Sequence, residues 1–351
     1  MRNRKEVEDM EFINESPMIR TYLYTAYVES VIGSHKNYRD WLANNYIQVY
    51  ATKNVENQLC VMDYMAGSVF GGCELLNIQH YDYDTRRKFA ENKELMQKEL
   101  TRLLDDKTAV YLYLDEFYIS NRTSYQKEHF VHDALLVRTC EGGFEYIGYD
   151  SLGNYAKSVI SCDEMCQALH NDNLCTILLR VNPKEYHFNI LKFIQMLDEY
   201  VHSYDSREHL ELYFDMKTYS KVFLSGRFVK ELVFGLNTYD TICRLFEYYN
   251  QTECFIDWRV LHLIHEHKVS MLYKIQYLED EGYISKDSEF YESYQEVLEL
   301  GKKLENMGLK YVVSKREKTN QKIREGLLEL KEKETKVLSE VLEVLQAKYV
   351  E

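Results

Sequence analysis

The chain has 351 residues, of which 45% are hydrophobic and 28% charged, a composition typical of globular proteins rather than disordered ones. Its formal net charge of −14 disfavours nucleic acids and anionic membranes as partners, because both are themselves negatively charged. No apolar run reaches the roughly 18 residues that a membrane span requires, and the first residues, MRNRKEVEDMEF, contain no signal-peptide core. We therefore expect a cytoplasmic protein.

The cysteines are scattered and form no CxxC pair, which disfavours a zinc knuckle or a thioredoxin-like site. The sequence also contains no phosphate-binding loop, dinucleotide fingerprint or GxSxG elbow. We expect neither a bound cofactor nor a metal ion.

The first half of the chain alternates between helical and strand patterns. A leading helix is predicted at 17–32, after Pro17, with Gly33 closing it as the C-cap. Further helices are predicted at 85–104 and 162–170, and strands at 46–51, 58–65, 109–119, 151–161 and 175–181.

The segment HFVHDALLVRTCEGGFEYIGYD, residues 129–150, predicts a hairpin that turns at Gly142-Gly143. His132 and Asp150 are nearly equidistant from this turn, allowing for a bulge of one or two residues. A carboxylate opposite a histidine can hold the imidazole in one tautomer and keep it basic. These two residues are therefore candidate catalytic residues. The simpler interpretation is a strand-end histidine near an ordinary turn aspartate.

From about Asn189 the apolar residues follow helical spacing, at 189–204, 228–249 and 257–280. The tail from about Asp287 predicts a long amphipathic helical pair whose heptad is interrupted by Glu334. The apolar heptad positions are Ile323, Leu327, Leu330, Val337, Val341 and Val344. We expect the pair to dock on its own protein, and a coiled-coil homodimer is the alternative.

Two more groups of polar residues are candidate sites. Within 257–268, His262 and Glu266 share a helix face, whereas His265 and His267 lie about 200° apart on the helical wheel and cannot bind one ion. The absence of HExxH and HxxEH favours an interhelical polar network over a metal site there. Asp115 and Glu116 end a buried strand and point to opposite faces, so they are not a paired acid and base. Asp115 and Tyr118 are candidate pocket residues.

The order of these elements resembles a known family. A leading helix closed by Gly precedes YMAGSVFGG, a helix, VYLYLDEFYIS, HFVHDALLV and FEYIGYDS, and the later segment YDTICRLF…IDWRVLHLIHEHKVSML resembles the helical part. This order, over about residues 12–280, resembles the butirosin biosynthesis protein H N-terminal domain family, which has a papain-like cysteine-peptidase fold. The resemblance implies an α+β papain-like core, a leading helix plus a mainly antiparallel sheet, at 1–185. A helical region at 186–285 and a long helical hairpin at 286–351 would follow.

The family's members are associated with nonribosomal peptide, polyketide or aminoglycoside pathways, and their implied chemistry is acyl transfer. A cysteine at the start of the leading helix attacks a thioester carried on phosphopantetheine, and an amine then takes the acyl group. Carried over to this chain, His132 would be the general base and Asp150 would orient it.

The nucleophile does not carry over, because the slot near the start of the leading helix contains no cysteine. Thr21 or Tyr22 falls at the expected spacing before Gly33, with Thr25 and Ala26 one turn later. Three explanations are open. The chain is a degenerate family member that binds its substrate without a covalent intermediate, or a threonine hydroxyl replaces the thiol. In the third, Ala26 stands in place of a native cysteine. Cys60 is the fallback nucleophile.

The expected function is an acyl or aminoacyl transferase that forms an amide from a thioester on an acyl or peptidyl carrier protein, with a small amine as acceptor. Carrier proteins are acidic, so docking would need basic segments such as 85–88 or 314–318. The alternative is a catalytically degenerate binding or scaffold protein of such a pathway. A peptidase is a third interpretation, which would require an open cleft.

Overall fold

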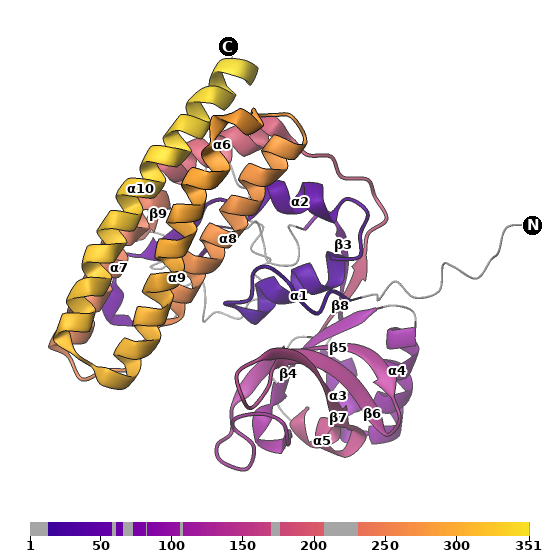
Figure 1. Ribbon diagram of the computed structural model, residues 1–351. Coiled ribbons are helices and arrows are strands. Elements are labelled where there is room, and N and C mark those ends of the chain that lie inside the picture. Colours follow the sequence, from indigo (N-terminus) through magenta and orange to yellow (C-terminus); the bar gives the residue numbers. More distant parts are fainter. Residues whose placement is uncertain are drawn as a thin grey trace, which may run out of the picture. The chain divides into compact units, whose positions relative to one another are not determined.

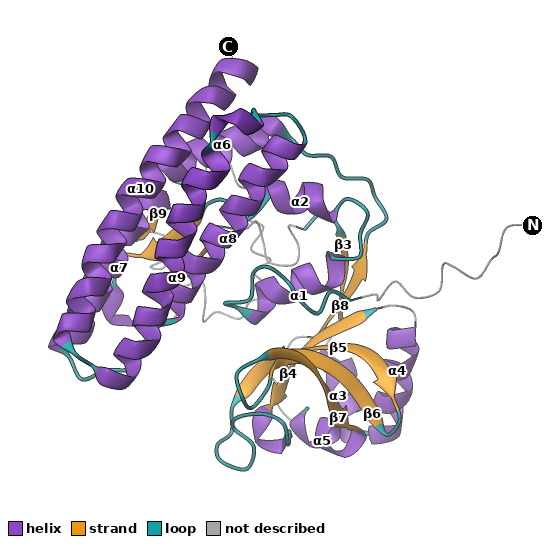
Figure 2. Cartoon of the chain, viewed as in Figure 1, coloured by secondary structure: helices purple, strands orange, loops and turns teal. Residues whose placement is uncertain are grey.

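The computed structural model describes residues 13–57, 61–65, 73–81, 83–105, 108–169, 176–206 and 231–350 (Figure 1). The chain is a mixed α+β protein with antiparallel sheets and a helical C-terminal region, as predicted (Figure 2). It divides into two compact units. Unit 1 comprises residues 1–38 and 69–186, and unit 2 comprises residues 39–68 and 187–351.

Unit 1 is built on an antiparallel six-stranded sheet in the order β3-β8-β4-β5-β6-β7. Its strands are β3 (Leu76–Tyr81), β4 (Ala109–Asp115), β5 (Val131–Cys140), β6 (Gly143–Tyr149), β7 (Tyr155–Ser161) and β8 (Thr176–Val181). The helices of this unit are α1 (Leu23–Ile32), α3 (Tyr83–Glu91), α4 (Lys93–Asp105) and α5 (Cys162–Ala168).

The predicted hairpin is β5–β6, with a register shift between Leu136 and Arg138 where a bulge was expected. Its two glycines are required for different reasons. Gly142 has a φ of 81°, the left-handed conformation that a tight turn needs. Gly143 is required by close packing, because a Cβ atom there would lie 2.1 Å from the carbonyl oxygen of Ile160 on β7.

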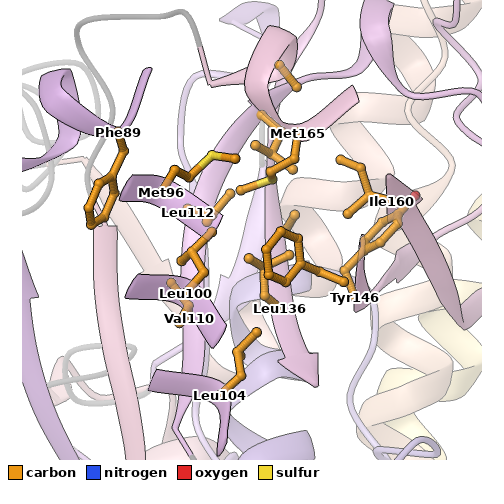
Figure 3. Close-up of a cluster of buried hydrophobic side chains, with 14 of the residues drawn as sticks. Phe89, Met96, Leu100, Leu104, Val110, Leu112, Leu136, Tyr146, Ile160 and Met165 are labelled. Atoms are coloured by element: carbon orange, nitrogen blue, oxygen red, sulfur yellow. The ribbon is translucent and has the colours of Figure 1, made fainter. Parts of the chain in front are cut away.

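Helices cover both faces of the six-stranded sheet. On one face, the apolar side chains of α4 and α5 pack against alternate residues of β4, β5 and β6 in a continuous core (Figure 3). Val110, Leu112 and Leu114 of β4 belong to this core. The intervening Tyr111 points to the other face, where its ring meets the ring of Tyr27 of α1 at 5.9 Å.

The leading helix is shorter than predicted. The backbone N–H groups of Met18 and Ile19 donate to the buried carboxylate of Glu29, at 2.8 and 3.1 Å, so residues before Leu23 fold back along α1. Gly33 is the C-cap, as predicted, but its φ is −59°. A Cβ atom at Gly33 would lie 2.4 Å from the Cβ of Asn14, so close packing requires glycine here.

Two predicted elements are divided by local capping. The helix predicted at 85–104 breaks at Asn92, whose side chain accepts from the backbone N–H of Leu95 and starts α4. The strand predicted at 109–119 ends at Asp115, whose carboxylate accepts from Phe117 N and starts a short 3₁₀ turn, Glu116–Tyr118.

Unit 2 is mainly helical. A small antiparallel sheet has the order β2-β1-β9, with β1 (Val49–Thr52), β2 (Met62–Tyr64) and β9 (Leu232–Phe234). The helices are α2 (Tyr38–Asn44), α6 (Ile190–His202), α7 (Thr238–Gln251), α8 (Arg259–Asp280), α9 (Phe290–Ser314) and α10 (Glu317–Tyr349). The helix predicted at 228–249 is therefore wrong at its start, because residues 232–234 pair with β1 instead.

The predicted tail is the helical pair α9 and α10, which packs on α6, α7 and α8 of unit 2 (Figure 1). Its predicted heptad residues are buried except Val344, which is exposed while the adjacent Leu345 is buried. Glu334, the interruption of the heptad, is completely buried. No helix in the described part of the chain combines the length and apolar character that crossing a membrane would require.

Candidate functional site

Two histidines, one just before β5 and one near its start, lie beside two carboxylates at the end of β4. Asp115 is the last residue of β4 and Glu116 follows it, while His132 pairs with Leu114 in the β4–β5 ladder. Asp115 contacts His129, and Glu116 contacts His132. The two carboxylates therefore contact different histidines.

His132 belongs to a group that we call the hairpin-base cluster: Glu116, Arg122, His132 and Asp133. The Nδ1 atom of His132 lies 3.2 Å from Glu116 Oε1, and its Nε2 lies 3.4 Å from Asp133 Oδ1. Arg122 Nε is 3.9 Å from Glu116 Oε1, and both side chains are buried. Burial raises the pKa of Asp133, although the neighbouring His132 acts in the opposite direction. Both ring nitrogens of His132 thus face carboxylates of the protein.

At the open end of the hairpin, two polar side chains hold β5 and β6 apart. The β5–β6 ladder ends at the pair Leu135 and Ile147. The hydroxyl of Tyr27 lies 3.2 Å from the carbonyl oxygen of Asp133 and 3.1 Å from that of Ile147, between the two strands. The guanidinium of Arg122 donates to the carbonyl oxygen of Tyr149. The two strands therefore part before they reach His132 and Asp150.

Asp150 caps its own turn instead of facing His132. Its carboxylate accepts from the backbone N–H groups of Leu152 and Asn154, at 2.9 and 2.8 Å, and from the side-chain amide of Asn154 at 3.3 Å. Hydrogen bonds from Asn154 lower the pKa of Asp150 below its usual value. The predicted contact between His132 and Asp150 is thus replaced by separate contacts of each residue.

The slot for the nucleophile lies at the start of α1, where Tyr22 is the N-cap. The Thr25 hydroxyl donates to the carbonyl oxygen of Tyr22 at 2.7 Å, and Ala26 is completely buried. Thr21 is also buried, with 6% of its surface exposed. The fallback candidate, Cys60, lies outside the described residues.

His129 differs from His132 in that its ring faces solvent. Its Nδ1 atom is 2.7 Å from Asp115 Oδ2, and 63% of the His129 side chain is exposed, against 36% for His132. The other Asp115 oxygen is fixed by the backbone N–H groups of Phe117 and Phe130, at 3.1 and 3.2 Å. The Phe117 ring stacks on the imidazole, with centroids 4.3 Å apart.

The predicted pocket residues Asp115 and Tyr118 both neighbour His129, since the rings of Tyr118 and His129 lie 5.8 Å apart. His129 was not singled out as a site residue from the sequence. The available signal was the run His129, Phe130, Val131, His132, which places two histidines where a strand begins after an Asp-Glu pair ends the preceding strand.

The polar network predicted within 257–268 is confirmed. Glu305 of α9 bridges two histidines of α8, with Oε1 2.5 Å from His262 Nδ1 and Oε2 2.6 Å from His265 Nδ1. His267 points elsewhere, with its Nε2 2.7 Å from the carbonyl oxygen of Ile47. Among the residues that the structure describes, no group of three His, Cys, Asp or Glu side chains is arranged to hold a metal ion.

No family model matches the chain, and no curated protein matches it significantly.

Proposed function

We propose that this chain is an acyl or aminoacyl transferase with a papain-like core, which forms an amide from a thioester on a carrier protein. The observation that carries the proposal is the pair His129 and His132, just before and near the start of β5, each within hydrogen-bond distance of a carboxylate at the end of β4. A histidine oriented by a carboxylate is the usual general base for acyl transfer.

The packing of α1 supports the papain-like core. The hydroxyl of Tyr149, the last residue of β6, donates to the carbonyl oxygen of Arg20 at 2.5 Å, just before α1 begins. Tyr27 of α1 contacts both β5 and β6 through their carbonyl oxygens. A helix that starts beside the open end of a histidine-bearing hairpin is the arrangement that the family resemblance implies.

The substrate would be an acyl group on the phosphopantetheine arm of an acyl or peptidyl carrier protein, and the acceptor a small amine. Carrier proteins are acidic, and this chain has a net charge of −14, so docking requires a local basic surface. The segment 314–318, which spans the end of α9 and the start of α10, contains Lys315, Arg316 and Lys318 and is one such surface.

A catalytically degenerate binding or scaffold protein of the same kind of pathway is the second candidate. It is favoured by the slot at the start of α1, where Thr25 is engaged with the backbone and Ala26 is buried. In that case the histidines and carboxylates contribute to folding rather than to chemistry.

Incubation with a panel of acyl and aminoacyl pantetheine thioesters, with and without amines, tests the proposal. Chromatography with mass spectrometry would detect the amide product, and intact-protein mass spectrometry would detect any acyl adduct. Amide formation above the uncatalysed rate supports the transferase. Thioester binding without any amide product would contradict the transferase proposal and leave the binding protein as the function.

A further inference from the structure

The pair formed by His129 and Asp115 has a geometry that the hairpin-base cluster lacks. Asp115 holds Nδ1 of His129, and no group in the described part of the chain lies at hydrogen-bond distance of Nε2. In His132, by contrast, Nε2 faces the carboxylate of Asp133 at 3.4 Å. A general base needs one ring nitrogen free to receive a proton from substrate, and His129 meets this condition.

The His129 ring is also held in place before any substrate arrives. Asp115 uses one carboxylate oxygen to accept two backbone N–H groups, which leaves the other oxygen directed at the imidazole. Stacking on Phe117 restrains the plane of the ring. Such support reduces the entropy lost when a catalytic group is positioned for reaction.

Resting on the proposed function, we infer that His129 is the catalytic general base, that Asp115 is its positioning residue, and that the amine attacks the thioester directly. This mechanism needs no nucleophilic side chain, which is consistent with the absence of cysteine from the slot at 21–26. The acceptor amine itself takes the role that a cysteine thiolate has in the related chemistry.

In this step the nitrogen lone pair of the amine forms a bond to the thioester carbonyl carbon. His129 Nε2 takes a proton from the attacking nitrogen, the carbon–sulfur bond breaks, and the proton passes to the departing sulfur. A thioester and an amine thus become an amide and a thiol, with no oxidant or reductant required and no acyl-enzyme formed.

The test measures amide formation from acyl pantetheine thioesters by the full chain and by His129→Gln. We expect the variant to be about 100-fold slower or more, the range for loss of a general base. The pH profile of the wild-type rate should be altered in His129→Gln. Asp115→Asn should lower the rate and alter the pH profile, and Asp115→Glu should restore part of it.

His202→Gln is a matched control. His202 is also half-exposed, with Nδ1 3.0 Å from Asp198 Oδ1 and a ring stacked on Tyr204 with centroids 5.4 Å apart, but it lies on α6 in unit 2. Its replacement should leave the rate unchanged. A second measurement needs no substrate: carbethoxylation by diethyl pyrocarbonate, mapped by digestion, should modify His129 faster than His132.

The outcomes separate this inference from the proposed function. Amide formation that persists in His129→Gln at the wild-type rate, or passes through an acylated side chain, overturns the inference and leaves the transferase standing. Faster carbethoxylation of His132 also overturns it. If the wild-type chain forms no amide with any substrate of the panel, the proposed function fails and the inference fails with it.

Discussion

At the scale of single residues, the buried guanidinium of Arg122 shapes the open end of the β5–β6 hairpin. It donates to the carbonyl oxygen of Tyr149, stacks on the Tyr146 ring at 4.7 Å, and lies 3.9 Å from Glu116. A Cβ atom at Gly148 would lie 2.5 Å from its Nη2 atom. A glycine in β6 thus provides the space that this cation occupies.

The contact between Arg122 and Gly148 predicts a non-additive pair of substitutions. Arg122→Ala should reduce the free energy of unfolding by about 3 kcal/mol, because Glu116 and Asp133 stay buried without their cation. Gly148→Ala should be destabilising in the wild-type chain and much less so beside Arg122→Ala, with a coupling of about 1 kcal/mol or more. Urea unfolding of the two single variants and the double variant measures this coupling, and simple additivity would contradict the contact.

At the scale of elements, α8 and α9 are joined by an ionic network that gives this pair a defined pH range of stability. Burial lowers the pKa of His262, but hydrogen bonds to Glu266 and Glu305 outweigh it and raise the pKa to about 9. Burial raises the pKa of Glu305, but hydrogen bonds from His262 and His265 outweigh it and lower the pKa to about 2. Each group is therefore charged in the folded state over a wider pH range than in the unfolded chain.

The pKa shifts of His262 and Glu305 determine how the free energy of unfolding depends on pH. The contribution of His262 is complete below its ordinary pKa of 6.5 and is lost as the pH rises through 9. The contribution of Glu305 is complete above 4.5 and is lost as the pH falls towards 2. We expect the free energy of unfolding to fall by on the order of 1–3 kcal/mol between pH 6.5 and 9.5 in the wild type.

The decisive comparison for this prediction is with His262→Gln. Urea unfolding at both pH values should show a smaller loss in this variant, whereas His202→Gln should lose as much as the wild type. An equal loss in His262→Gln would contradict a role for the network.

In α10, the residue that breaks the heptad joins the helices of unit 2. The Glu334 carboxylate lies 2.5 and 2.7 Å from the ammonium nitrogen of Lys268 in α8. It also accepts from the hydroxyls of Tyr200, Tyr239 and Tyr294, which come from α6, α7 and α9. One carboxylate thus contacts four other helices, and its position along α10 selects the register in which they pack.

This network predicts that a second substitution restores part of the stability lost through a first. Lys268→Met should cost about 3–5 kcal/mol, because it leaves the buried Glu334 carboxylate without a cation. Adding Glu334→Gln should recover part of this loss, since the amide is uncharged and still accepts from tyrosine hydroxyls. The test compares the unfolding free energy of Lys268→Met with that of the double variant. A double variant less stable than Lys268→Met would contradict the prediction.

At the scale of the whole molecule, the chain leaves unit 1 after residue 38 and returns to it at residue 69. The intervening segment supplies β1, which pairs with β9, and the Ile47 carbonyl that accepts from His267. Gln48 Nε2 also donates to the buried Ser206 hydroxyl at 2.8 Å. Unit 2 therefore depends on residues far from its main helices in the sequence.

A fragment of residues 187–351 is consequently expected to unfold at a lower temperature than unit 2 does in the full chain, or without cooperativity. Mixing the fragment with a separate polypeptide of residues 1–186, which contains the missing segment, should restore part of the stability. Circular dichroism during heating measures both effects. An unchanged transition for the isolated fragment would show that β1 and its neighbours contribute little.

The sequence by itself determined the features that depend on neighbours along the chain. The 2-residue period and the glycines predicted the hairpin at 129–150, and the helical period predicted the tail. Helix-face geometry at 257–268 predicted that His265 and His267 point apart, because both lie on one continuous helix.

Only the tertiary structure decided which groups meet across elements. Asp150 was the expected partner of His132, but β5 is flanked by β4 on its other side, and Glu116 reaches the histidine from there. Residues 46–65 fall within the first predicted domain, at 1–185, yet β1 in this segment pairs with β9, and both strands belong to unit 2. Periodicity reports how buried each residue is within its own element, whereas the choice of partner depends on long-range packing and on single buried groups such as Arg122.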